Sequence, residues 1–289
     1  MDGDMSEFTY IKTDAQFGEF LERLSARGVE TIAADIEGEF NLHVYGERFC
    51  LLQLYDGHEQ VVVDPFTVSA DSIKKLLESP DPAKVTYDSA SDRLLLAKSH
   101  GITMAGIVDL RPAVELLEFP KQDLSSVIRA TIGGTESGSK KKFQQYNWTR
   151  RPLDRGAIEY ALQDVLHLFS VRDVLFERLR ADGLMERYEE ENQRRQDRLP
   201  DVNRKPGVFR TERHKRLTRE QKREFERLHT IRDRHARELD LPPNTVVRND
   251  DLFGLVTGRL APEQIAGNRR MPEARLRSIK DQFAGRDPQ

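Results

Sequence analysis

Cysteine is almost absent from this sequence: Cys50 is the single one among 289 residues. One cysteine excludes an intramolecular disulfide and a cysteine-rich zinc site. It also fits a reducing cytoplasm, which is the location we expect. No apolar run approaches the length of a membrane span, so we expect no membrane partner. The first ten residues, MDGDMSEFTY, are acidic and polar, unlike the basic and apolar segments of a secretory signal.

The chain also lacks a strong net charge, but its charges are unevenly distributed. The formal net charge is −3. Residues 201–289 carry 21 Lys and Arg against 14 Asp and Glu, or +7, whereas residues 1–200 carry 25 against 35, or −10. A basic segment suits nucleic acid, although a solvated helical surface would give the same count. The asymmetry indicates two parts with different roles.

Residues 1–196 alternate between strand-like and helix-like runs, which predicts an α/β domain. Apolar and β-branched runs predict strands at 31–37, 49–56, 59–65, 84–87 and 107–110. Apolar periodicity predicts helices at 71–79, 90–99 and 112–118, another from near Asp123, and a long one from Asp154 towards Arg180. The Gly/Ser-rich run at 131–142 predicts a loop.

The charge-dense stretch 186–216 has almost no apolar pattern and contains the candidate linker, which we place at 197–212. An amphipathic helix is predicted beyond it at 217–239, with Thr218 as its N-cap. Shorter helical patterns follow at 250–258 and 272–283. Residues 213–289 are therefore expected to form a small all-helical domain.

Two acids end the first predicted strand. Asp35 and Glu37 are two residues apart, so both side chains point to one face of the strand. Neighbouring carboxylates repel each other, and a divalent cation with oxygen ligands, Mg²⁺ or Mn²⁺, would relieve that repulsion. Such pairs arise by chance in a chain with 49 acids. Position gives this pair its weight, because open α/β sheets bind ligands at the carboxyl ends of their strands.

Further acids occur at two places along the chain. The stretch VTYDSASDRLLLAK offers Asp88 and Asp92, either of which could be an ordinary acid at the start of a helix. In EYALQDV, Tyr160 and Asp164 are four residues apart, which places them on one face of a helix. Asp164 interrupts an otherwise apolar stripe, which is unusual unless that face has a function.

Taken together, these stretches resemble the three exonuclease motifs of ribonuclease D, a DEDD 3′–5′ exonuclease of the tyrosine subclass. The matching residues are DIE at 35–37, SDRLLL at 91–96 and WTRRPLDRGAIEYALQDVLHL at 148–168. The resemblance covers about residues 30–180. Residues 217–283 also resemble the helical HRDC domain, through the run RDRHARELDLPPNTVVRNDDL at 232–252. It implies a ribonuclease H-like α/β fold, with a mixed sheet flanked by helices, followed by a small all-α HRDC-like domain.

Carried over by position, the resemblance implies the catalytic residues Asp35, Glu37, Asp92, Tyr160 and Asp164. The four acids would be the ligands of two divalent metal ions, Mg²⁺ or Mn²⁺, with Asp35 bridging the two. Two such ions clamp the attacking and leaving oxygens of an in-line displacement. Tyr160 would orient the attacking water, since a phenol with a pKa near 10 is a poor base at neutral pH.

The resemblance also chooses between neighbouring acids. It favours Asp92 over Asp88 because a leucine-rich helix follows Asp92. Glu37 is favoured over Glu39, because the strand is expected to end at Gly38. Tyr87 departs from the family pattern, where a histidine is usual, and this departure concerns the substrate side of the second motif.

Residues around the motifs are candidates for substrate contact. Lys141 and Lys142 could meet phosphates, and Gln144 could bond a sugar or base. Trp148 could stack on a base or simply pack in the core. Arg151, before Pro152, could touch RNA or fix the start of the helix. Three residues past the first motif could line a pocket for the 3′ end: Phe40, His43 and Tyr45.

The function expected from the sequence is a metal-dependent 3′–5′ exoribonuclease that trims single-stranded RNA 3′ ends, such as those of tRNA precursors, and releases nucleoside 5′-monophosphates. A related 3′–5′ DNA exonuclease is an alternative, because no residue reads the 2′-hydroxyl. A catalytically inactive nucleic-acid-binding adaptor is another, although the complete set of acids and the tyrosine argues against it. The sequence names no protein partner.

Overall fold

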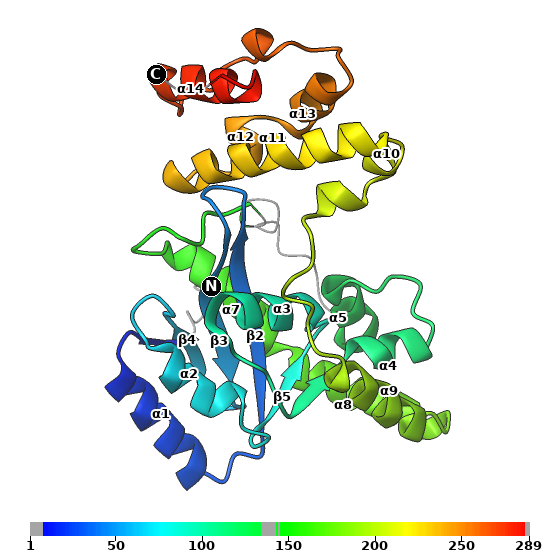
Figure 1. Cartoon of the computed structure of the whole chain (residues 1–289). Coiled ribbons are helices and arrows are strands. Elements are labelled where there is room, and N and C mark those ends of the chain that lie inside the picture. The colour runs from blue at the N-terminus through cyan, green and yellow to red at the C-terminus, as the bar shows by residue number, and fades with distance from the viewer. Residues whose placement is uncertain (1–7, 134–142, 144, 287–289) are drawn as a thin grey trace. The chain divides into compact units, whose positions relative to one another are not determined.

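The computed structural model describes residues 8–133, 143 and 145–286. The chain divides into two compact units. The first unit comprises residues 1–38 and 48–202, and the second comprises residues 39–47 and 203–289 (Figure 1). Among the helices of the described ranges, none is long and apolar enough to cross a membrane.

A six-stranded mixed sheet forms the centre of the first unit. Its strands, in the order in which they lie side by side, are β1 (Phe8–Ile11), β4 (Gln60–Val63), β3 (Glu47–Tyr55), β2 (Thr31–Phe40), β5 (Ala83–Thr86) and β6 (Ile107–Asp109). Strands β1 and β4 pair in parallel, as do β2 with β5 and β5 with β6, whereas β3 and β4 are antiparallel. This confirms the expected mixed sheet.

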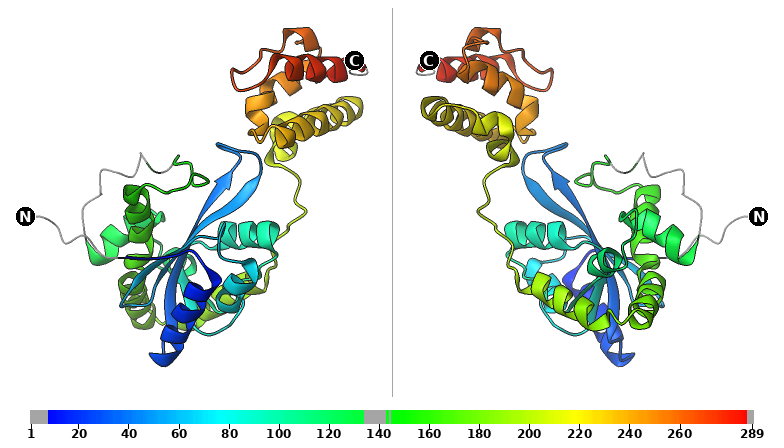
Figure 2. Two further views of the ribbon diagram at one scale, coloured as in Figure 1. Left: turned by 90° about the vertical axis from the view of Figure 1, so that its left-hand side faces the viewer. Right: turned by 90° about the vertical axis from the view of Figure 1, so that its right-hand side faces the viewer.

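Helices cover both faces of the sheet, as Figure 2 shows. One face packs against α1 (Asp14–Ala26), α2 (Ala70–Leu77) and α3 (Ala90–His100). The other packs against α4 (Arg111–Leu116), α5 (Leu124–Ile132), α7 (Arg155–Leu166), α8 (Leu168–Ala181) and α9 (Met185–Asp197). The strands are apolar on both sides because both sides are covered.

Alternation along β2 connects the two cores. Ile32 and Ala34 are buried in the core beneath α1, α2 and α3, whereas Ala33 is buried in the core beneath α7 and α8. Side chains two residues apart share a face, so Asp35 and Glu37 follow Ala33 towards the α7 side. The sheet therefore determines which helix the two acids face.

The second unit is helical apart from residues 39–47. Its described helices are η1 (Gly207–Arg210), α10 (Glu212–Lys215), α11 (Arg219–Glu238), α12 (Pro243–Val246), α13 (Asn249–Val256), η2 (Pro262–Gln264) and α14 (Glu273–Phe283). Thr218 caps α11 as predicted, and its hydroxyl and the Gln221 side chain form a capping box. The rings of Phe225 and Phe253 pack at a tilt in the core of this unit, with their centroids 4.6 Å apart.

Three sequence-based predictions of secondary structure are corrected. Strand β2 does not end at Gly38 but continues to Phe40, into a tight turn in which the N–H of Asn41 donates to the carbonyl of Gly46 (3.1 Å). The long helix predicted towards Arg180 is two helices that meet at His167. Neither proline nor glycine marks that break in the sequence.

The third correction concerns the start of the charge-dense stretch 186–216, for which the sequence predicts no helix and which forms helix α9. Charge pairs stabilise this helix: the carboxylate of Glu191 accepts from the guanidinium of Arg194 at 2.6 Å and from that of Arg195 at 2.8 Å. Only Tyr188 and Asn192 are buried along α9. Two buried positions among thirteen residues give no apolar periodicity, so the sequence does not predict this helix.

Candidate active site

The first two acids of the candidate site lie on β2. Asp35 and Glu37 are partly buried, unlike Ala33 and Ala34, which are inaccessible within the sheet. The strand thus leaves its core and reaches a more open region while its side chains still alternate. A carboxylate pair that retains some solvent access can receive an ion or a substrate.

The third acid, Asp92, lies in the first turn of α3, which follows β5. The connection between them turns sharply at Asp88, whose φ is +56°. Ser89 is the residue before the helix, but its side chain makes no capping bond to α3. Asp92 is partly buried, whereas Asp88 is exposed, which agrees with the preference for Asp92.

The remaining two residues lie on α7. Its buried face consists of Ala157, Ile158, Ala161, Leu162 and Val165, which pack into the core of the first unit. Tyr160 and Asp164 flank that face and are partly buried. The ring of Tyr160 packs against Phe143, with ring centroids 5.5 Å apart. Packing of the apolar face therefore fixes how α7 presents the phenol and the carboxylate.

Electrostatics show that the four acids share one region. Burial and the charges of Asp92, Asp164 and Glu37 raise the pKa of Asp35 well above its ordinary value. Burial, Asp164 and Asp92 raise the pKa of Glu37 to about 8. Burial raises the pKa of Asp92 to about 7, with contributions from Asp109 and Asp88. Elements far apart in the sequence thus bring Asp35, Glu37, Asp92 and Asp164 within electrostatic reach of one another.

This set of donors fits divalent metal ions. Burial and mutual repulsion raise the pKa values of Asp35 and Glu37, and hard cations prefer such oxygen ligands. Within the described ranges, no three acid, histidine or cysteine side chains converge closely enough to hold an ion in their present rotamers.

Tyr160 is suited to donating a hydrogen bond. Burial and the nearby Asp164, Glu37 and Asp35 raise the pKa of its phenol to about 12. The phenol is therefore protonated at neutral pH and cannot act as a general base. A water molecule or a phosphate oxygen beside the acids could accept a hydrogen bond from this phenol.

Glu39 points to the same side of β2 as Asp35 and Glu37 but has a different role. It is buried (2% exposed), and its Oε1 accepts the N–H groups of Leu42 and His43, the latter at 2.9 Å. Its other oxygen lies 3.1 Å from Nδ1 of His43. Glu39 thus fixes the turn after β2. The preference for Glu37 agrees with this, although the reason inferred from the sequence, a strand ending at Gly38, was wrong.

Two predicted substrate contacts are engaged within the protein. Trp148 is buried (4% exposed) and packs against Tyr146 at 4.9 Å, so it is a core residue rather than a platform for a base. All five N–H groups of Arg151 donate to protein acceptors. They are the carboxylate of Asp64 (2.6 and 2.8 Å) and the carbonyls of Cys50, Trp148 and Arg150 (2.7, 2.8 and 2.8 Å).

Asp64 was not singled out from the sequence, and its role appears only through this contact. Together with Arg151 it ties the segment before α7 to β3 and β4, which supports the interpretation that Arg151 fixes the start of the helix. The hydroxyl of Tyr10 also donates to Asp64 (3.0 Å). The sequence signal was weak, because an acid after an apolar strand is common.

The other predicted contacts are placed as follows. His43 and Tyr45 belong to the second unit, where the hydroxyl of Tyr45 donates to Asp233 (2.8 Å) and accepts from Arg237 (3.2 Å). Phe40 is 52% exposed. Three candidates lie outside the described residues: Lys141, Lys142 and Gln144.

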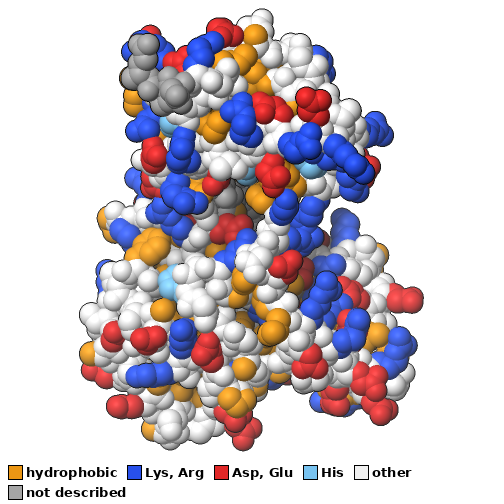
Figure 3. Space-filling model, viewed as in Figure 1, with side chains coloured by type: hydrophobic (Ala, Val, Ile, Leu, Met, Phe, Trp, Pro, Cys, Tyr) orange, Lys and Arg blue, Asp and Glu red, His pale blue; other side chains and the backbone are white. Residues whose placement is uncertain are grey.

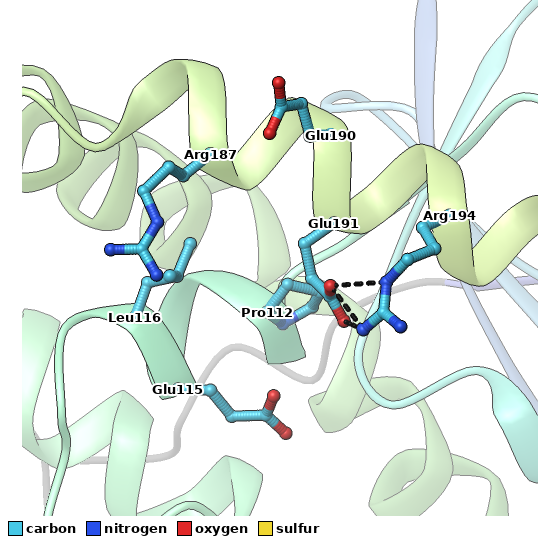
Figure 4. A pocket seen from close by; sticks show the side chains of 7 residues that line it. All are labelled: Pro112, Glu115, Leu116, Arg187, Glu190, Glu191 and Arg194. Carbon is cyan, nitrogen blue, oxygen red and sulfur yellow. Dashed lines mark hydrogen bonds and ion pairs between the residues drawn. The ribbon is translucent and has the colours of Figure 1, made fainter.

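A surface groove of about 340 Å³ lies elsewhere on the first unit (Figure 4). It is lined by residues of α4 and α9: Pro112, Glu115, Leu116, Arg187, Glu190, Glu191 and Arg194. Glu191 and Arg194 pair with each other in the groove. None of the four acids lines it, so it is not part of the candidate active site.

Comparison with known proteins adds a family and relatives. Residues 8–180 match the model of a family described as 3′–5′ exonuclease. The Exosome complex component 10 homolog of Caenorhabditis elegans is 28% identical over 153 residues, which are 52% of this chain and 17% of that protein. A Ribonuclease D of Acidiphilium cryptum is 25% identical over 285 residues, 95% of this chain and 68% of that protein.

Among solved structures, Escherichia coli RNase D, described as an exoribonuclease involved in structured RNA processing, has the same fold. It aligns with a TM-score of 0.71 at 22% identity, over 96% of this chain and 75% of that chain. The chain spans less than half the length of several curated relatives that it matches, 17% and 44% in two cases.

Proposed function

The chain belongs to the 3′–5′ exonuclease family, and from this premise we propose that it is a metal-dependent 3′–5′ exoribonuclease of the ribonuclease D type. Its substrate is the single-stranded 3′ end of RNA, such as a tRNA precursor. Its products are nucleoside 5′-monophosphates. Because of Tyr160 we assign it to the tyrosine subclass of the DEDD exonucleases, and we propose that residues 213–289 act as an HRDC-like domain.

The observation that carries this proposal is the meeting of four acids with one phenol. Asp35, Glu37 and Asp92 all have raised pKa values, and Asp164 contributes to two of those shifts. Structural acids avoid such repulsion, so a cluster of this kind is typical of a functional site. Tyr160, one turn before Asp164 on α7, is affected by the same charges.

Two divalent ions, Mg²⁺ or Mn²⁺, would be held by Asp35, Glu37, Asp92 and Asp164. When bound, such ions stabilise the charge on the attacking and leaving oxygens of a phosphodiester. The chain's own contribution is to place four carboxylates within reach of one another and to keep the phenol protonated. Tyr160 then donates a hydrogen bond that orients the attacking water at the terminal phosphodiester.

The second unit supplies affinity for longer RNA. Its charges are mixed, as Figure 3 shows, and many of its arginines are paired, for example Arg275 with Glu238 and Arg248 with Asp251 (2.9 Å). Within the described ranges, Arg219 and Arg223 at the start of α11 are exposed and make no ion pair. Exposed cations of this kind are able to replace counterions on a phosphate backbone.

Hydrolysis of labelled oligonucleotides tests the function. The full chain is incubated with 5′-labelled single-stranded RNA or DNA of one sequence, with Mg²⁺, with Mn²⁺ or with EDTA. We expect RNA to be shortened from its 3′ end, one nucleotide at a time, with release of nucleoside 5′-monophosphates and no reaction in EDTA.

Two variants make the test specific. Asp35→Asn should abolish the reaction while retaining the fold, and Glu19→Gln, an exposed position on α1, should leave it unchanged. Faster shortening of DNA than of RNA would identify a DNA exonuclease instead. RNA binding without metal-dependent hydrolysis would identify an adaptor, and an active Asp35→Asn variant would refute the assignment of the site.

A further inference from the structure

Asp109, at the end of β6, is a buried carboxylate that belongs to none of the motifs. It is 5% exposed. Its Oδ1 accepts the backbone N–H groups of Asp88 (2.8 Å) and Arg111 (2.9 Å). Its Oδ2 accepts both the N–H and the hydroxyl of Ser89, each at 2.9 Å. Four donors hold this carboxylate in one orientation.

These bonds define the turn from β5 into α3. Asp88 adopts a positive φ of +56°, which is uncommon for a residue with a side chain, and its N–H points at Asp109. The hydroxyl of Ser89, which would ordinarily cap the helix, donates to Asp109 instead. The start of α3 is therefore set by a contact with β6, and Asp92 lies three residues further on.

Helix α9 holds β6 from its other side. The side-chain amide of Asn192 accepts from the N–H of Asp109 (3.1 Å) and donates to the carbonyl of Ile107 (2.8 Å). Gln196 accepts from the N–H of Ile107 (2.9 Å), and the hydroxyl of Tyr188 donates to the carbonyl of Asp109 (3.1 Å). Side chains of a helix thus bond the outer edge of β6 as a neighbouring strand would.

Arg93 connects α9 directly to α3. It follows Asp92 in the sequence and is 7% exposed. Its guanidinium donates to the carbonyls of Arg195 (2.7 Å), Gln196 (2.7 Å) and Arg198 (3.3 Å), which are the acceptors that the end of α9 leaves unpaired. The first turn of α3 is therefore fixed at two points on either side of Asp92.

We propose that Asp109 is a positioning residue for Asp92: its bonds to the β5–α3 turn, braced by α9, hold the Asp92 carboxylate where it can share a divalent ion with the β2 acids. This inference rests on the proposed function only in taking Asp92 as a metal ligand. Asp109 itself is held by four donors and faces the turn, so it is not a ligand.

The experiment compares Asp109→Asn with a matched control. In asparagine one of the two oxygens is replaced by an NH₂ group, which cannot accept a hydrogen bond. Two of the four donors therefore lose their acceptor, and the turn loosens. Asp56 is the control: it is also buried, and its Oδ1 accepts the N–H groups of His58 and Glu59, both at 2.8 Å, in the β3–β4 turn. Asp56→Asn should disturb a turn of the same kind, and also weaken the ion pair of Asp56 with Arg27, without affecting the four acids of the site.

Three quantities are measured on the full chain: the Kd of Mn²⁺ by calorimetry on metal-free protein, kcat and KM on a short RNA, and Tm. For Asp109→Asn we expect Mn²⁺ binding about 10–100-fold weaker, because residues that orient metal ligands have effects of that size. The kcat should fall at low Mn²⁺ and recover at saturating Mn²⁺, with KM for RNA unchanged. Asp56→Asn should lower Tm alone.

A milder variant covers the case in which Asp109→Asn does not fold. Ser89→Ala removes one of the four donors and should weaken Mn²⁺ binding in the same direction. The effects on the Kd of Mn²⁺ are compared with that of Asp56→Asn at an equal loss of Tm. If neither Asp109→Asn nor Ser89→Ala weakens Mn²⁺ binding more than this control does, Asp109 has only a structural role and the inference is wrong. Wild-type protein that binds Mn²⁺ but hydrolyses no RNA would refute the proposed function and leave the positioning of Asp92 standing.

Discussion

Glu37→Gln should stabilise the metal-free protein, and the structure determines the size of the effect. The pKa of Glu37 is about 8 against an ordinary 4.5, chiefly because of burial and then because of Asp164 and Asp92. The folded state holds this proton more tightly than the unfolded state. Its contribution to stability is therefore fully present below pH 4.5 and is lost as pH rises to about 8.

At pH 7 the unfolded chain has ionised Glu37, while the folded chain still keeps most of the proton. Each pKa unit corresponds to about 1.36 kcal/mol, so the span from 4.5 to 7 amounts to about 3 kcal/mol as an upper bound. Relaxation of the neighbouring acids reduces this to about 1–2 kcal/mol. In a domain of this size that is a rise in Tm of about 2–8 °C.

Thermal unfolding in EDTA from pH 5 to pH 8 measures the effect. The advantage of Glu37→Gln over wild type should grow with pH, and Glu19→Gln on the exposed face of α1 should show no such trend. Added Mn²⁺ should reverse the order, because wild type gains more from the ion. A variant that is less stable than wild type at pH 8 in EDTA would show that burial and repulsion do not raise the pKa of Glu37.

Three other changes have definite expected outcomes. Tyr160→Phe keeps the packing against Phe143 and removes one hydrogen bond. The kcat should therefore fall about 10²–10⁴-fold, while KM and Tm stay almost unchanged. An unaffected single-turnover rate would exclude the phenol from the reaction. Replacing Arg219 and Arg223 by glutamine should weaken binding of long RNA and lower the slope of log Kd against log salt by about 1.4, while a short oligonucleotide is cleaved as before. Burial lowers the pKa of His229 to about 4, so its contribution to stability is present above pH 6.5 and is lost as pH falls towards 4. His229→Gln should therefore make the Tm fall less steeply as pH decreases from 6.5 to 4. Thermal unfolding followed by circular dichroism measures this, and an equally steep fall in the variant would contradict the prediction.

Local chemistry predicted much of the fold from the sequence. Thr218 and Asp123 have capping side chains, and both helices begin where those residues predict. Five of the six described strands lie in runs that the sequence predicts as strands, although β2 continues to Phe40 and β1 (Phe8–Ile11) was not predicted. Asp35 and Glu37 could be paired from their spacing alone, because alternation on a strand is independent of what surrounds it.

The features that were missed depend on contacts between distant segments. Helix α9 has few apolar residues because it packs through Asn192 and Tyr188, whose polar groups bond the edge of β6. Asp109 and Asp64 act by accepting hydrogen bonds from residues that lie on other strands and turns. No local pattern marks such residues, since an acid after a strand looks the same whether it is buried or exposed.

The hydrogen bonds between α9 and β6 also limit where the chain can be truncated without exposing the edge of the sheet. Asn192, Gln196 and Tyr188 bond all four outward-facing backbone groups of Ile107 and Asp109. A chain ended at residue 180, where the match to the family stops, would expose those groups as an unpaired strand edge. Open edges recruit strands from other molecules. We therefore expect a chain without helix α9 to aggregate more readily than the full chain.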